Sequence, residues 1–193
     1  MSDMIWLAST SPRRKKLLAK LLGRKFRIIK PDYDESCLSI KDPKGFVLKA
    51  AHNKLLSVLN KVKNGIVISA DTIVVLKGKI LGKPYNEANS RKMLRDISGK
   101  NVYVFTSICV ADAGSKKIVK KYEKSKVSIK KLSSEQIESY IRTKEPFDKA
   151  GAFAVQGKGS FLVENVEGDY DNVVGLPLKL LSKILKGFGV NVA

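Results

Sequence analysis

The chain has 193 residues, of which 44% are hydrophobic, so it can fill the core of one large domain or two small lobes. Its 37 Lys and Arg against 18 Asp and Glu give a formal net charge of +19, which attracts polyanions such as nucleotides and nucleic acids. No run approaches the roughly 18 apolar residues that cross a bilayer, and Cys37 and Cys109 are too few for a disulfide framework. The composition therefore argues against a membrane-spanning or disulfide-rich protein and predicts a cytoplasmic one.

Strand and helix patterns alternate along the whole chain. Strands are predicted at residues 4–8, 26–29, 66–69, 73–77, 79–81, 102–110, 118–132 and 161–166. Helices are predicted at residues 12–22, 43–60, 87–97, 133–142 and 177–186. Pro12, Pro43 and the cap Asn86 mark helix starts, and Gly23 marks the end of the first helix. The pattern predicts an α/β or α+β fold with one elongated mixed sheet.

The start of the first predicted helix has an unusual charge. Arg13, Arg14, Lys15 and Lys16 crowd a helix terminus that already carries about half a positive charge from its macrodipole. Free backbone N–H groups, the hydroxyls of residues 9–11 and two guanidinium groups would together bind a phosphate. A solvated basic turn is the alternative.

Two acidic residues are candidate metal ligands for a phosphoryl-transfer site. Asp71 is expected at the end of the buried strand 66–69, a common position for catalytic residues in α/β proteins. Glu35 lies in a polar loop with Asp32 and Asp34. Asp71 could equally cap a turn, and the loop carboxylates could be solvated charges.

Two other motifs are weaker. Residues 78–84 resemble a phosphate-binding loop, but the spacing of the glycines and Pro84 fail the Walker pattern. Lys83 could still meet a phosphate as a point charge, or lie exposed on a hairpin. The sequence contains one histidine, His52, and no Gly-x-Ser-x-Gly motif, so acyl-transfer chemistry is disfavoured. We interpret His52 as an ordinary helix residue.

An ordered set of motifs resembles the Maf nucleotide pyrophosphatases over essentially the whole chain. The matching segments are Leu7-Ala8-Ser9-Thr10-Ser11-Pro12-Arg13-Arg14, Ala51-x-x-Lys54, Ala70-Asp71-Thr72, Gly82-Lys83-Pro84, Glu145-Pro146-x-Asp148-Lys149-Ala150-Gly151-Ala152, Val155-Gln156-Gly157 and Asn172-Val173-Val174-Gly175-Leu176-Pro177. The resemblance implies one domain over residues 1–193, with an elongated mixed sheet, flanking helices and two lobes around a central cleft. It also implies a homodimer.

The same resemblance implies hydrolysis of a nucleoside triphosphate to the monophosphate and pyrophosphate with Mg²⁺ or Mn²⁺. Asp71 would accept the proton from water, and Glu35 with Asp71 would hold the metal. The phosphate and metal site would be lined by Ser9, Arg14, Glu35, Lys54 and Lys83. Base preference would depend on Arg13, Thr72 and Gln156.

Details of the motifs resemble the branch of the family that acts on dTTP and UTP, so pyrimidine nucleotides are the expected substrates. Two positions depart from the family pattern, Val102 in place of a common His and Val155 in place of a common Ile. Two other functions stay open, a basic nucleic-acid-binding module and an inactive nucleotide-binding regulator. Nucleic acid is not the expected partner, because aromatic residues are only 7% of the chain and are not interleaved with basic ones.

Overall fold

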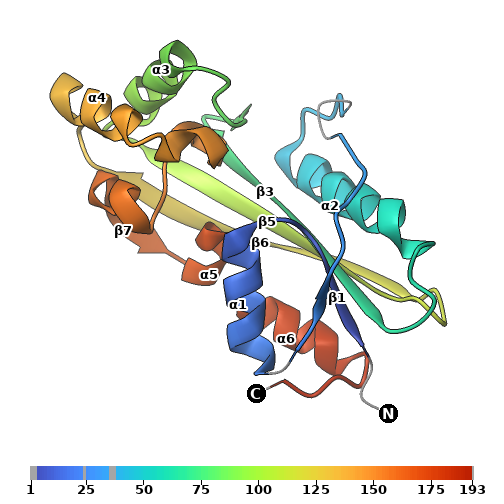
Figure 1. Cartoon of the computed structure of the whole chain (residues 1–193). Helices are drawn as coiled ribbons and strands as arrows, with labels where there is room; N and C mark the ends of the chain where they lie inside the picture. The colour runs from blue at the N-terminus through green and yellow to red at the C-terminus, as the bar shows by residue number, and fades with distance from the viewer. Residues whose placement is uncertain (1–3, 24, 35–37, 193) are drawn as a thin grey trace.

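The structure, a computed structural model, describes residues 4–23, 25–34 and 38–192. Its centre is a mixed sheet of seven described strands in the order β2-β1-β3-β5-β6-β7, with β4 pairing with β3 (Figure 1). The strands are β1 Ile5–Ala8, β2 Arg27–Ile28, β3 Ile66–Leu76, β4 Lys79–Leu81, β5 Asn101–Asp112, β6 Ile118–Ile129 and β7 Val163–Glu167. β1 runs parallel to β2 and β3, and the other pairs are antiparallel.

Helices cover both faces of this sheet. They are α1 Pro12–Leu22, α2 Pro43–Leu59, α3 Glu87–Ile97, α4 Ser134–Arg142, α5 Tyr170–Val174 and α6 Leu178–Lys186. The described residues also form the short 3-10 segments η2 Glu145–Asp148, η3 Ala150–Ala152 and η4 Gly157–Leu162. In Figure 1, α1 and α6 lie together near the two termini, and α3 and α4 lie at the opposite end of the sheet.

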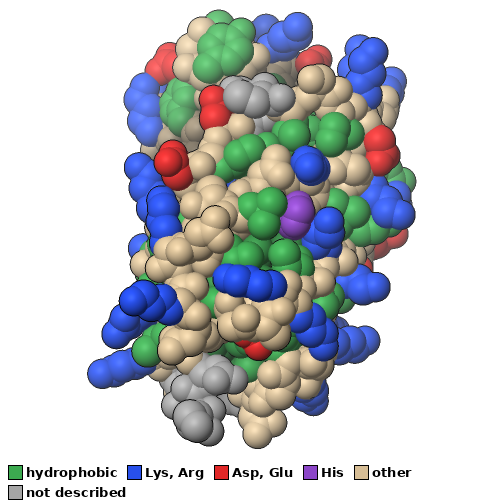
Figure 2. All heavy atoms as spheres, turned by 90° about the vertical axis from the view of Figure 1, so that its right-hand side faces the viewer, with side chains coloured by type: hydrophobic (Ala, Val, Ile, Leu, Met, Phe, Trp, Pro, Cys, Tyr) green, Lys and Arg blue, Asp and Glu red, His purple; other side chains and the backbone are tan. Residues whose placement is uncertain are grey.

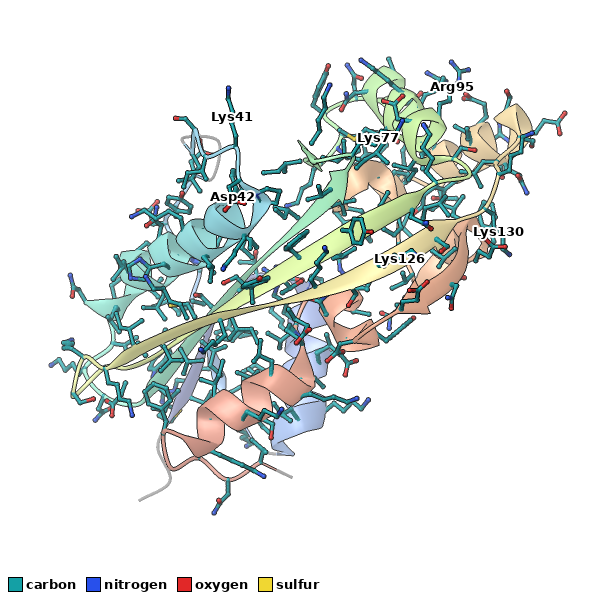
Figure 3. All side chains as sticks on the ribbon, turned by 180° about the vertical axis from the view of Figure 1, so that it is seen from behind. Lys41, Asp42, Lys77, Arg95, Lys126 and Lys130 are labelled. Carbon is teal, nitrogen blue, oxygen red and sulfur yellow. The ribbon has the colours of Figure 1, made fainter. Side chains whose placement is uncertain are left out.

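The alternation of side chains along β5 shows which helices cover which face. Ile108 and Val110 pack in a core with α1 and α6, whereas Cys109 and Ala111 pack in a core with α2. Successive side chains on a strand point to opposite faces. α2 therefore covers the face opposite to α1 and α6, and Figure 3 shows α2 beside the long strands from behind.

Separate hydrophobic clusters divide the molecule into two parts. One cluster joins α1 and α6 to β1, β3 and β5, while another joins α3 and α4 to β5, β6 and the 3-10 segments. The long strands β3, β5 and β6 pass through both parts. The predicted mixed α/β fold with one elongated sheet and flanking helices is confirmed.

Several of the predicted strands have wrong bounds. The strand predicted at residues 118–132 is shorter, since β6 ends at Ile129. β3 is one strand over Ile66–Leu76 instead of two, so Asp71 lies in its middle and not at its end. β5 pairs with β3 continuously from Ile66 to Val75, and this partner carries the strand through the polar residues. Phe161 and Leu162 belong to η4, and β7 begins at Val163.

The other edge of β3 is interrupted beside Asp71. β1 pairs with residues 66–69 of β3 and ends there, and β4 pairs with residues 74–76. Among the described residues, the stretch 70–73 thus has a strand partner only on the β5 side. Because neighbouring side chains alternate between faces, Asp71 points to the α2 face and Thr72 to the α1 face at this opening.

Positive charge is spread over one face of the molecule. In Figure 2, Lys and Arg side chains are distributed across the face drawn and do not form one strip. In the part of the chain that the structure describes, no helix is long and apolar enough to cross a membrane.

Gly65 enters β3 with a backbone angle that favours glycine. Its φ is +99°, and a Cβ atom there would overlap the carbonyl oxygen of Met4, which accepts a hydrogen bond of 2.9 Å from the N–H of Ile66. Gly78 has a similar φ of +79°, but a Cβ atom there would meet nothing. Substitutions at these two glycines therefore distinguish the effect of backbone strain alone from the effect of strain combined with steric overlap.

We expect Gly65→Ala to lower the free energy of unfolding by about 2 kcal/mol or more, and Gly78→Ala by about 1 kcal/mol, because only the first adds a clash to the left-handed strain. Urea denaturation of both variants measures the difference. Equal losses would contradict the close approach of Gly65 to Met4.

Candidate active site

Two adjoining cavities open along the interrupted edge of β3. The first, of about 300 Å³, has apolar walls that include Val74, Val104 and Phe153, and the polar side chain of Gln156 also lines it. The second, of about 430 Å³, is lined by Ser9, Thr10 and cationic side chains. The first volume lies at the lower end of ligand sites, which commonly combine apolar walls with a few polar groups.

A small set of residues lines both cavities and marks their junction. These residues are Ser11, Arg13, Arg14, Lys54, Lys83 and Asp148. Four of the six are cations, so the junction is strongly positive. An elongated ligand with an apolar or aromatic end and an anionic end would fill both cavities.

The N-terminus of α1 supplies two of these cations. Ser11 caps the helix, Pro12 takes its first position, and no acidic residue lies in the first turn. Arg14 donates from Nε to the carbonyl oxygen of Gly175 and from Nη2 to Oγ1 of Thr72, both at 2.9 Å. The guanidinium group of Arg14 is therefore held in a fixed plane at the opening in β3.

Arg13 reaches across the opening to the segment η2. Its Nη1 lies 2.8 Å from Oδ2 of Asp148, and Nη2 donates to the backbone oxygen of the same residue at 3.4 Å. Lys149 also contacts the Asp148 carboxylate. Partial burial opposes the charge of this carboxylate, but the hydrogen bonds from Lys149 and Arg13 outweigh it and lower the pKa of Asp148.

Asp71 and Lys54 form an ion pair on the other face of β3. Nζ of Lys54, which comes from the middle of α2, lies 2.5 Å from Oδ1 of Asp71. Asp71 is only 3% exposed, yet it lines the first cavity. A carboxylate held this way by an ammonium group beside a cavity can accept a proton or bind a cation.

The remaining predicted residues fall into the same region where the structure describes them. Ser9 is buried, accepts a hydrogen bond of 3.2 Å from the N–H of Ser11 and lines the second cavity. Lys83 lines both cavities, and Gln156 lines the first. Glu35, the second predicted metal ligand, lies outside the described residues.

The described residues include no group of three or more His, Cys, Asp or Glu side chains that could hold a metal ion. Asp71 lines the first cavity and contacts the cationic junction through its ion pair with Lys54. Mg²⁺ is usually held by one or two carboxylates together with substrate phosphates and water. One buried carboxylate next to a phosphate-sized cationic cavity fits that donor set.

Several site residues were missing from the sequence prediction. Asp148, Lys149 and Glu145 line the first cavity, and Lys30 lines the second. Asp148 and Lys149 stand in a matching family motif, but no role was assigned to them. The contact of Asp148 with Arg13 joins positions that are 135 residues apart, so no local pattern could reveal it.

The pKa of Asp148 gives a prediction for the pH dependence of stability. Its folded-state pKa lies below the ordinary value of 3.8, so its contribution to stability is present above that pH and is lost as the pH falls through the folded-state pKa. We expect the difference in Tm between the wild type and Asp148→Asn to be constant between about pH 5 and pH 8 and to shrink at lower pH. A difference that grows on acidification would contradict the ion pairs.

Comparison with known proteins agrees with this geometry. Residues 4–188 match the family described as Maf-like protein. The chain is 45% identical over 186 residues to the dTTP/UTP pyrophosphatase of Methanococcoides burtonii, covering 96% of this chain and 95% of the relative. It is 47% identical to the enzyme of the same name from Methanosarcina barkeri over 97% and 95% of the two chains, and 43% identical to that of Dictyoglomus thermophilum over the full length of both. The chain therefore belongs to the Maf family.

Proposed function

We propose that the protein hydrolyses dTTP and UTP to the nucleoside monophosphate and pyrophosphate. The observation that carries this proposal is the buried Asp71 carboxylate, paired with Lys54 at the junction of an apolar cavity and a cationic one. The family and the names of the relatives support the same reaction. A role in removing unwanted nucleotides from the cellular pool follows from this activity.

The two cavities accommodate the two ends of a nucleotide. The base and sugar occupy the first cavity, where Val74, Val104 and Phe153 offer apolar contact and Gln156 offers hydrogen bonds. The triphosphate lies in the second cavity, where Ser9 and Thr10 precede the N-terminus of α1. The bond between the α- and β-phosphates then falls at the junction.

Asp71 is the proton acceptor in this proposal. A water molecule attacks phosphorus, its proton passes to the Asp71 carboxylate, the anhydride bond breaks and pyrophosphate leaves. Arg14, Lys54 and Lys83 stabilise the negative charge on the transferring phosphoryl group. Arg14 is well suited to this because Thr72 and Gly175 already fix its guanidinium group.

We also propose that Asp71 binds a divalent cation, Mg²⁺ or Mn²⁺, together with substrate phosphates and with Glu35. When bound, the cation neutralises phosphate charge and orients water. Lys54 holds the Asp71 carboxylate in place for both tasks.

The homodimer and the cytoplasmic location implied by the sequence remain predictions. The mass of the protein in solution tests the prediction of a homodimer.

A panel of nucleoside triphosphates tests the reaction and its base preference. We expect pyrophosphate release with Mg²⁺ or Mn²⁺, with kcat/KM for UTP and dTTP at least about tenfold above that for CTP, ATP or GTP. Addition of EDTA should abolish it. If no nucleotide releases pyrophosphate, the proposed function is wrong.

Substitution of the proton acceptor tests the mechanism. Asp71→Asn keeps the size of the side chain but removes its charge and its basicity, so kcat for UTP should fall by about 100-fold or more. Asp96→Asn, at an exposed position of α3 away from both cavities, is the matched control and should keep the wild-type rate. Wild-type turnover in the Asp71 variant would exclude Asp71 as the base.

A further inference from the structure

A chain of hydrogen bonds runs from the active site into the core through two threonines. Thr72 on β3 and Thr106 on β5 are cross-strand partners, and their Oγ1 atoms lie 3.0 Å apart. Thr106 is completely buried. Its Oγ1 lies 2.8 Å from the backbone oxygen of Asn172, in the short helix α5.

The direction of each hydrogen bond follows from the chemistry of its ends. A carbonyl oxygen only accepts, so Thr106 gives its single hydroxyl hydrogen to Asn172. Thr106 then has only lone pairs left, so the hydroxyl of Thr72 must donate to it. A guanidinium group only donates, so Arg14 donates to Thr72. The chain therefore has one polarity, from Arg14 through Thr72 and Thr106 to Asn172.

This polarity decides what Thr72 can offer a ligand. Its hydrogen is directed to Thr106 and one lone pair accepts from Arg14, which leaves one lone pair. Thr72 lines the first cavity, so this lone pair is available to a ligand there. Thr72 can thus accept a hydrogen bond from a ligand but cannot donate one. The group that it meets must be a donor.

We infer that Thr106 is a positioning residue that makes Thr72 an obligate acceptor and so favours bases with a ring N–H. Uracil and thymine carry a hydrogen on N3, whereas N3 of cytosine is an acceptor and would face a lone pair of Thr72. Thr106 also holds Thr72 against Arg14, which keeps the guanidinium group at the phosphate junction. This inference rests on the proposed hydrolysis of pyrimidine nucleotides and adds a source for its selectivity.

The chain offers substitutions that separate the hydroxyl from packing. Thr106→Val keeps the shape and removes the hydroxyl, while Thr106→Ser keeps the hydroxyl and removes a methyl group. The neighbouring residue Ser107 is also completely buried, but it points to the opposite face of β5 and donates to the carbonyl oxygen of Lys121. Ser107→Ala therefore controls for the loss of a buried hydroxyl from the same strand.

The test measures kcat/KM for UTP and for CTP in these variants, with Tm as a check on folding. We expect Thr106→Val to lower kcat/KM for UTP by about tenfold and to reduce the UTP to CTP ratio by a similar factor, the scale of one hydrogen bond. Thr106→Ser and Ser107→Ala should keep both values within about threefold of wild type. An unchanged ratio in Thr106→Val, or an equal loss in Thr106→Ser, would overturn the inference.

A second readout separates this inference from the proposed function. Calorimetric binding of UTP and of CTP, measured in EDTA, needs no turnover and ranks the same three variants. If the wild type binds UTP but hydrolyses no nucleotide, the proposed function fails, and the inference is judged by whether Thr106→Val alone loses the preference for UTP. If the wild type binds UTP and CTP equally, the site has no preference for UTP that Thr106 could explain, and the inference is wrong.

Discussion

The site depends on residues 70–73 of β3, which among the described residues have a strand partner on one edge alone. A strand inside a sheet is normally bonded on both edges, which leaves no room for a ligand beside it. Here β1 stops at Ala8 and β4 ends opposite Val74, so the described structure is open beside Asp71 and Thr72. β5 pairs along the whole stretch and keeps both side chains rigid. The opening lets one strand present a carboxylate to one face and a hydroxyl to the other.

The charge of the first helix is accounted for by the same opening. Four cations at a helix N-terminus are unfavourable to the helix itself, but two of them make specific contacts across the opening. Arg14 is held by Thr72 and Gly175, and Arg13 is held by Asp148. The protein thus keeps cationic groups oriented toward a place where a triphosphate supplies the compensating charge. Preorganised charges of this kind cost no rearrangement when the reaction occurs.

Much of the fold could be predicted from the sequence, because the long helices and strands carry strong apolar periodicity. The continuity of β3 could not be predicted, because Asp71 and Thr72 interrupt the apolar pattern of the strand. The pairing with β5 explains why the strand continues through them. α5 has only five residues, which is too short to show a period. Ser9, Arg14, Lys54 and Lys83 were predicted around the phosphate site from family motifs, and the structure brings them together. The contacts of Asp148 and Thr106 depend on the register of the strands and on segments that are distant in the sequence. No local sequence pattern contains this information.

The arrangement of basic and aromatic residues in the fold differs from their arrangement along the sequence. Basic and aromatic residues are not interleaved along the chain, but the pairing of β5 with β6 places Nζ of Lys124 4.2 Å from the ring centroid of Tyr103. Such contacts hold a lysine over a ring. On the face drawn in Figure 2, the Lys and Arg side chains are dispersed. The concentrated cations of Arg13, Arg14, Lys54 and Lys83 are those at the cavities.

In the proposed reaction, the opening in β3 receives the nucleotide with its α- and β-phosphates beside Asp71. A crystal structure with Mg²⁺ and a UTP analogue, in which a methylene group replaces the oxygen between these phosphates, tests it most directly. We expect the phosphates to lie among Ser9, Arg14 and Lys83, the bridging carbon next to Asp71, and the base between Thr72 and Gln156. A nucleotide bound elsewhere, or one whose phosphates lie away from Asp71, would contradict it.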